Sequence, residues 1–128
     1  MLVKSLQKND CAIVALTHYF GIDYHCVINE LQGYADKLGI KWHREKGTPQ
    51  ALINAFCYAR GLNKVVKIPR RGQDKLTGIV TLYNNNKTQY HCVAMIDGNV
   101  FDLVAPEGMH ISEYRSRVNC NHITEVWR

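Results

Sequence analysis

The sequence predicts an α+β domain in which helices come first and strands follow. Over residues 11–60, apolar residues recur at the three- and four-residue spacing of amphipathic helices. From Lys64 onward the period shortens to two, which is typical of strands. Because helices and strands that occupy separate parts of a chain usually form separate layers, this order favours an antiparallel sheet with helices packed on it.

Two helices are expected before residue 34. The first runs from Cys11 to Phe20 and ends at Gly21, since glycine readily adopts the left-handed conformation that closes helices. The second begins after Asp23, its cap, and ends near Gly33.

A third helix follows the irregular stretch 34–47. It begins at Thr48-Pro49, with Thr48 as the cap and Pro49 at the first helical position, and it ends near Arg60-Gly61. Its apolar residues keep a helical spacing, so we expect one face of it to be buried.

The second half of the chain predicts an antiparallel meander. Asp97-Gly98 is a tight hairpin turn, because both residue types tolerate the positive φ angles that such turns need. The expected strands cover residues 64–68, 78–83, 90–96 and 99–103, with a closing edge strand at 122–127.

Length and composition indicate one globular domain, residues 1–128. A chain of 128 residues can bury roughly two-thirds of its unfolded surface. The net charge of +5 and the pI near 9.0 permit acidic partners. The densest basic segment, Lys64 to Lys75, is accompanied by no nucleic-acid-binding motif, so nucleic acid is not the expected partner.

The five cysteines lie at irregular intervals, which favours reduced thiols over a disulfide framework. Polar residues 7–10 interrupt the N-terminal segment, so we expect no signal peptide. No stretch reaches the ~20 apolar residues of a membrane-spanning helix. We therefore expect a cytoplasmic protein without membrane insertion.

Cys11 stands at the start of the first helix, directly after Asp10. The Asp10 carboxylate is expected to accept hydrogen bonds from the first helical amides. The positive end of the helix dipole favours the thiolate form of Cys11 and so prepares a nucleophile. The alternative is that Cys11 is a small core residue, since free cysteine is often buried.

A thiol nucleophile needs a base, and His91 is the best placed of the six histidines because it opens a strand directly after a turn. If the Asp97-Gly98 turn pairs Ile96 with Asn99, Asp102 comes opposite Val93, two residues from His91. A carboxylate there can orient the imidazole. The three residues predict a Cys11-His91-Asp102 group.

These segments resemble the papain-like cysteine peptidases of the bacteriocin-processing (C39) type. The resemblance covers about a third of the chain, in two blocks: residues 7–16 and residues 90–106. It implies a papain-like fold and cleavage of a peptide or protein substrate after small residues. It also implies Cys11 as nucleophile, His91 as general base, Asp102 as the orienting residue and Gln7 as an oxyanion donor.

The chain departs from that family pattern at two positions. Gln7 stands four residues before Cys11, where the family's glutamine stands six before, and Ala12 replaces a common glycine. If the shorter spacing moves the oxyanion role to another side chain, Asn9 is the first candidate.

Two other classes of function are open. A zinc site could draw on thiols and imidazoles, but there is no Cys-x-x-Cys pair and Cys120-x-His122 stands alone, so neither a metal nor another cofactor is expected. A papain-like module that binds or inhibits a protein partner without reacting is the alternative to an enzyme. Replacing Cys11 separates these two, because it removes catalysis and leaves binding.

Overall fold

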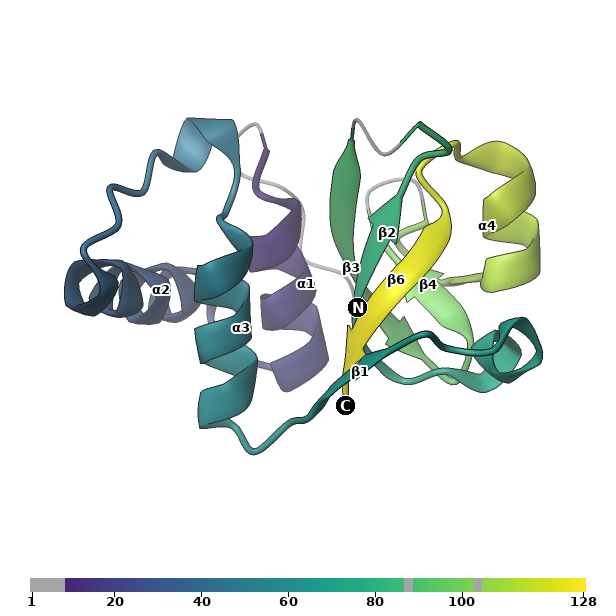
Figure 1. The fold of residues 1–128 in the computed structure, drawn as a ribbon, viewed down its shortest axis with the longest axis horizontal. Coiled ribbons are helices and arrows are strands. Elements are labelled where there is room, and N and C mark those ends of the chain that lie inside the picture. Colours follow the sequence, from purple (N-terminus) through teal and green to yellow (C-terminus); the bar gives the residue numbers. More distant parts are fainter. Residues whose placement is uncertain (1–8, 87–88, 103–104) are drawn as a thin grey trace.

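The computed structural model describes residues 9–86, 89–102 and 105–128, and places helices against a six-stranded sheet (Figure 1). The elements in chain order are α1 (Cys11–Phe20), α2 (Tyr24–Leu38), η1 (Arg44–Lys46), α3 (Gln50–Ala59), β1 (Lys64–Val66), η2 (Arg70–Lys75), β2 (Gly78–Tyr83), β3 (Tyr90–Ile96), β4 (Asn99–Phe101), β5 (Met109–His110), α4 (Ile111–Arg117) and β6 (His122–Trp127). This confirms the predicted α+β class.

All neighbouring strands run antiparallel, in the order β1-β6-β2-β3-β4-β5. The prediction that residues 122–127 form an edge strand is wrong, because β6 lies between β1 and β2. Val126 and Trp127 are buried, as expected for a strand covered on both faces. The short and mostly exposed β1 is the edge strand on this side of the sheet.

The β3–β4 hairpin has the predicted turn and register. Asp97 and Gly98 both have positive φ, 51° and 82°, and Ile96 pairs with Asn99. A Cβ at Gly98 would meet the carbonyl oxygen of Asp74 well inside van der Waals contact, so this turn needs glycine. Asp102 follows the last residue of β4 directly. The end of the expected 99–103 strand lies outside the described residues.

The first helix has the predicted bounds, and Gly21 closes it in the left-handed conformation. The second helix does not end near Gly33, because α2 continues to Leu38 and Gly39 closes it. A glycine inside a helix costs only about 1 kcal/mol. Burial of Leu31 and Ala35 on the packed face of α2 offsets this cost.

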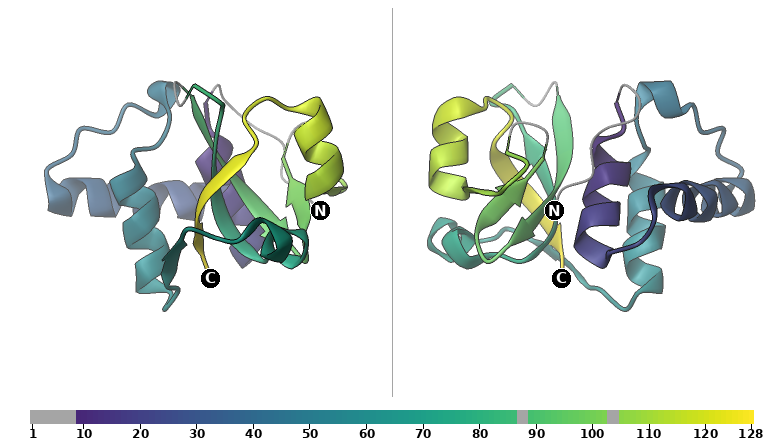
Figure 2. Two further views of the ribbon diagram at one scale, coloured as in Figure 1. Left: turned by 45° about the vertical axis from the view of Figure 1, so that its right-hand side comes forward. Right: turned by 180° about the vertical axis from the view of Figure 1, so that it is seen from behind.

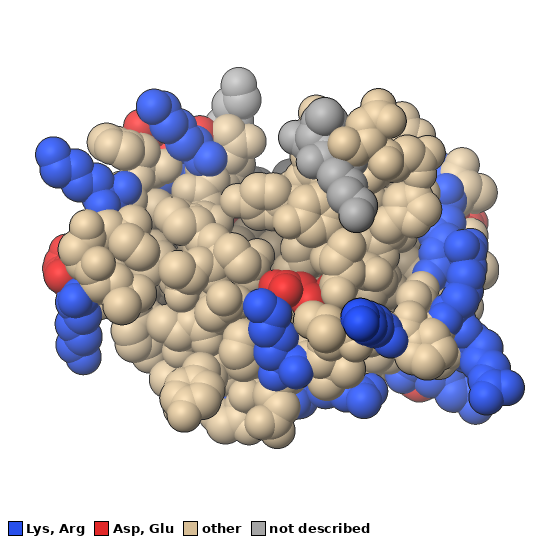
Figure 3. Space-filling view, in the orientation of Figure 1, with Lys and Arg blue, Asp and Glu red and all other residues tan. Residues whose placement is uncertain are grey.

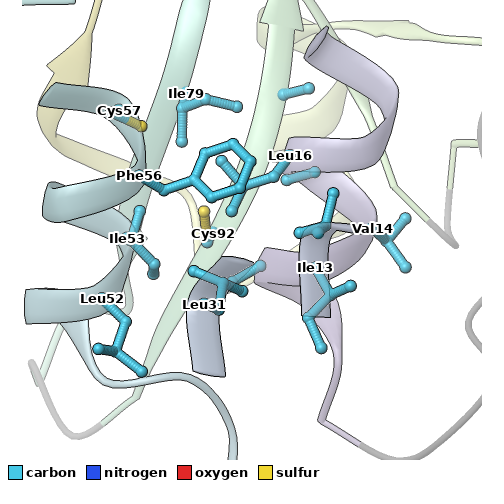
Figure 4. Packing of buried hydrophobic residues seen from close by; sticks show 14 of the residues in the cluster. Ile13, Val14, Leu16, Leu31, Leu52, Ile53, Phe56, Cys57, Ile79 and Cys92 are labelled. Atoms are coloured by element: carbon cyan, nitrogen blue, oxygen red, sulfur yellow. The ribbon is translucent and has the colours of Figure 1, made fainter. Parts of the chain in front are cut away.

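The sheet is buried on both faces, and the residues that fill its two sides alternate along the strands. In β3, Cys92 and Ala94 pack toward α1–α3, whereas Val93 and Met95 pack into a second cluster on the opposite face. Figure 4 shows the first cluster, in which Phe56 of α3 lies among side chains from the other helices and the sheet. This double burial explains why β2 and β3 are nearly continuous apolar runs, interrupted by Thr81 in β2 and by His91 near the start of β3.

Helix α4 covers the face of the sheet opposite α1, α2 and α3 (Figure 2). Ile111 and Tyr114 of α4 are fully buried in the second cluster. The N-terminal end of α1 and the beginning of β3 lie beside each other at the boundary between the helices and the sheet (Figure 1).

Across the described residues no single helix is long and apolar enough to cross a bilayer, and the α1–α2 pair that reaches the required length is bent by 114°.

Candidate active site

Cys11 is the first residue of α1 and is partly buried. Asp10 occupies the N-cap position, but the prediction that its side chain caps the helix is wrong, since it makes no capping hydrogen bond. Its φ and ψ, −101° and 23°, differ from the extended angles of most N-cap residues. The buried Asp10 carboxylate instead accepts a hydrogen bond from the Tyr24 hydroxyl at 2.9 Å, which joins the start of α1 to α2.

The Cys11 thiol has a lowered pKa. Burial by itself raises the pKa of a thiol, but the hydrogen bond and the charge of the His91 imidazole outweigh that effect. Backbone amides of Cys92 and Ala12 also donate toward the sulfur and lower the pKa further. The thiolate of Cys11 is therefore stabilised by several groups.

Cys57, Cys92 and Cys120 have raised pKa values, in contrast to Cys11. Burial raises the pKa of Cys57 to about 12, and burial together with the charge of Cys11 raises the pKa of Cys92 and of Cys120. Cys120 donates weakly to the Leu82 carbonyl, with sulfur and oxygen 3.4 Å apart. Cys11 is thus the thiol that its surroundings make reactive.

His91 is the second residue of β3, directly after Tyr90 begins the strand, and it lies between Cys11 and Asp102. Its Nε2 atom is 3.2 Å from Oδ2 of Asp102, which leaves Nδ1 as the ring nitrogen available to the thiol. Burial lowers the pKa of the imidazole, but Asp102 and Cys11 together raise it to about 9. A protonated His91 beside a thiolate Cys11 is the charge state that this arrangement favours.

The buried Asp102 carboxylate is held by groups from two other segments. Its Oδ2 atom accepts a hydrogen bond from the Tyr114 hydroxyl at 2.7 Å, and its Oδ1 atom accepts one from the Ala105 amide at 3.0 Å. Burial raises the pKa of this carboxyl group, but the bonds from His91 and Tyr114 outweigh burial, so the pKa is lowered. Asp102 therefore stays ionised and keeps one orientation.

Tyr114 is a part of the site that the sequence did not predict. It belongs to α4, and the region after Gly108 had too weak a pattern to predict a helix. A short sequence pattern could have predicted this helix. Ile111, Tyr114 and Val118 have helical spacing, and Glu113 lies in the first turn. Burial and the Asp102 carboxylate raise the pKa of the Tyr114 hydroxyl, which therefore remains a donor.

We expect Asp102→Asn to lower the free energy of unfolding by about 1–3 kcal/mol, because asparagine has one acceptor oxygen where the carboxylate has two. Turned one way, its NH₂ group opposes the Ala105 amide; turned the other way, it replaces the oxygen that accepts from Tyr114 and faces His91, and in both cases the side chain has lost its charge. Urea denaturation measures the change. Asp97→Asn is the control, because Asp97 is exposed and has the positive φ that asparagine tolerates. Equal midpoints for Asp102→Asn and the parent would contradict this account.

Cys11, His91 and Asp102 line a cleft of about 650 Å³ at the boundary between the helices and the sheet. The helical wall includes Lys46, Gly47 and Thr48, which precede α3. The opposite wall includes residues at the start of β3, together with Tyr114 of α4 and Val118 just after it. In the part of the chain that is described, Lys46 is the one Lys or Arg that lines the cleft. Other basic side chains gather away from it, over η2 and α4 at the right-hand edge of Figure 3.

The two oxyanion candidates have different outcomes. Gln7 lies outside the described residues, so its role stays a prediction. Asn9 lines the cleft, but its side-chain NH₂ donates to the Glu45 carbonyl at 2.7 Å and so joins the start of α1 to η1. Ala12 is buried. The bacteriocin-processing peptidases, which the sequence resembles, often have glycine at this position.

Neither a search for metal ligands nor comparison with known proteins assigns a function to the cleft. No group of three or more His, Cys, Asp or Glu residues is arranged to hold a metal ion, as far as the described residues extend. The geometry that remains is a thiol with a lowered pKa, an imidazole and a buried carboxylate in one cleft. Compared with models of protein families, with curated proteins and with solved structures, the chain matches none of them.

Proposed function

We propose that this protein is a cysteine-dependent hydrolase or acyl transferase that acts on a peptide or amide bond through a thioester at Cys11. The observation that carries the proposal is the lowered pKa of Cys11 beside His91, in a cleft where every other resolved thiol pKa is raised. A thiolate paired with an imidazolium is the usual state of an activated cysteine nucleophile.

The reaction follows from the positions of three side chains. The Cys11 thiolate adds to the carbonyl carbon, and the His91 imidazolium then gives its proton to the leaving amine as the C–N bond breaks. Water attacks the resulting thioester while neutral His91 accepts its proton, and the C–S bond breaks to release the acid and the thiolate. If an amine replaces water, the same steps give acyl transfer. Asp102 keeps the imidazole in the required orientation throughout.

The developing oxyanion needs donors near Cys11. The Cys11 amide is one of the first amides of α1, which have no acceptor within the helix. By its resemblance to the bacteriocin-processing peptidases, the chain supplies Gln7 as the second donor. One such donor is typically worth about 2.7–4 kcal/mol of transition-state stabilisation.

The finer fold assignment, a papain-like domain, belongs to the same proposal. Its support is the arrangement of the cleft: the nucleophile begins the central helix, while the base is the second residue of a strand of the antiparallel sheet on the other wall. A cleft lined by one basic side chain among the described residues favours a peptide or protein substrate over a phosphate-rich one.

The acyl-enzyme intermediate is the direct test of this function. Incubation of the protein with N-acetylglycine p-nitrophenyl ester should give a rapid burst of nitrophenol, followed by slower turnover. Mass spectrometry of the protein quenched in acid during the burst should find the acyl group on the Cys11 peptide. An acyl group spread evenly over the five cysteines, with no burst, would be evidence against the proposal.

A further inference from the structure

Two buried side-chain hydroxyls in the described part of the chain have no hydrogen-bond partner, those of Thr17 and Thr48. Thr48 is 6% exposed and lines the cleft together with Cys11. Thr17 is 5% exposed and lies near the other end of α1, beside a separate hollow. Among the described residues, one such hydroxyl therefore belongs to a residue that lines the candidate active site, and a comparable one lies away from it.

Thr48 has no capping role that would explain its hydroxyl. The sequence predicts Thr48 as the N-cap of the third helix, and this prediction is wrong. Pro49 occupies the N-cap position, and its carbonyl accepts the first helical bond, from Leu52 at 3.0 Å. Pro49 cannot cap with a side chain, and the Thr48 hydroxyl bonds to none of the described helix amides.

A buried hydroxyl without a partner costs free energy, which a bound ligand can recover by supplying the missing hydrogen bond. Threonine can present either its hydroxyl or its methyl group to the same space, because rotation between staggered χ1 positions exchanges the two. Thr48 is among the residues that line the cleft, so this rotation can turn its buried hydroxyl toward a bound group.

The main chain beside Thr48 is already engaged. The Gly47 amide donates to the Arg44 carbonyl at 3.0 Å, and the Gly47 carbonyl accepts from Nε1 of Trp42 at 3.1 Å. These two bonds fix the loop that forms this part of the helical wall. A ligand that bonded to the Gly47 amide would displace an existing bond, whereas a ligand that bonded to the Thr48 hydroxyl would add one.

We propose that Thr48 is a substrate-binding residue, whose hydroxyl forms a hydrogen bond with a peptide group of the substrate segment lying along the helical wall of the cleft. This inference rests on the proposed function and deepens it, since it assigns the contact that holds the peptide beside Cys11. A hydroxyl suits a peptide group because it can donate to the carbonyl or accept from the amide.

Two alkylating reagents separate binding of a peptide from reactivity of the thiol. Iodoacetamide carries no peptide, whereas N-acetyl-Gly-Gly chloromethyl ketone presents a short peptide to the cleft and alkylates the same sulfur. The glycines follow from the small residues that the family resemblance implies. The second-order rate constant of Cys11 alkylation is measured for the parent, Thr48→Val, Thr48→Ser and Thr17→Val.

Thr48→Val should react with the peptide reagent roughly tenfold more slowly than the parent, the effect expected for one lost hydrogen bond. Its rate with iodoacetamide should stay within about twofold, since Thr48 has no part in the pKa of Cys11. Thr48→Ser keeps the hydroxyl and should keep the peptide rate. Thr17→Val removes an unpaired hydroxyl of the same kind and should leave both rates unchanged.

Each outcome bears on a different claim. If the parent reacts no faster with the peptide reagent than its intrinsic reactivity toward a small thiol predicts, the cleft does not bind peptides and the proposed function falls with this inference. If the parent is fast and Thr48→Val is equally fast, Thr48 does not bind the substrate and the proposed function stands. Thr48→Ala replaces Thr48→Val, with the same expected loss, if the valine variant does not fold.

Discussion

Replacing Cys11 with alanine should lower turnover by roughly a millionfold, the loss seen when the nucleophile of a comparable triad enzyme is removed. The reason is that a thioester cannot form without the sulfur, and no neighbouring thiol can replace it. Burial raises the pKa of Cys92 and of Cys120, so both remain poorly nucleophilic near neutral pH. Turnover of the p-nitrophenyl ester and of an amide substrate measures the effect.

Cys120→Ala is the matched control for Cys11→Ala, because Cys120 is a partly buried thiol that lines the same cleft. It should retain turnover within a few-fold of the parent. Loss of turnover in Cys11→Ala with peptide binding retained, as measured by calorimetry, identifies an enzyme, whereas a papain-like binding module binds the peptide and has no turnover to lose. A Cys11→Ala variant with unchanged turnover would exclude the thioester mechanism.

Replacing His91 with alanine should lower turnover by about 100- to 10,000-fold, the usual contribution of a general acid or base. It should also raise the pKa of Cys11, since the imidazole no longer opposes the effect of burial. Iodoacetamide labelling across pH measures this pKa, and its midpoint in His91→Ala should lie above that of the parent.

The parent should show two different pH profiles, because alkylation and turnover need different protons. Alkylation should rise with pH through the lowered pKa of Cys11 and stay high, since it needs only the thiolate. Turnover should rise through the same pKa and then fall as His91 loses its proton near pH 9, since the leaving amine needs that proton.

The control for His91→Ala is His122→Ala, because His122 is exposed on β6 and bonds to Asn85. This variant should keep both pH profiles of the parent. An unchanged Cys11 midpoint in His91→Ala would mean that the imidazole does not activate the thiol.

Local patterns were sufficient to predict much of the fold. The bounds of α1 followed from apolar spacing and a closing glycine, and the register of β3 against β4 followed from the two residues of the Asp97-Gly98 turn. These features depend on residues a few positions apart, whose conformational preferences act without the rest of the chain. The same register predicted that Asp102 comes opposite Val93, two residues from His91, and so predicted the proximity of the two side chains.

Residues that depend on packing between distant segments were predicted less well. Asp10 bonds to Tyr24 of the next helix rather than to its own helix, and β6 is an inner strand because both of its neighbours pair with it. No local sequence pattern predicts the partner of Asp10 or the position of β6 in the sheet. Each is decided by which buried groups meet once the layers have packed.

The sequence by itself determined that helices precede strands, that a helix begins at Cys11 and that a hairpin joins His91 to Asp102. Only the tertiary structure decided that Tyr114 holds the Asp102 carboxylate and that Thr48 lines the cleft with its hydroxyl unpaired. The physical reason is the range of the interactions involved. Periodicity and turn preferences act over a few residues, whereas a buried hydrogen bond is made or left unmade by segments that meet only in the folded chain.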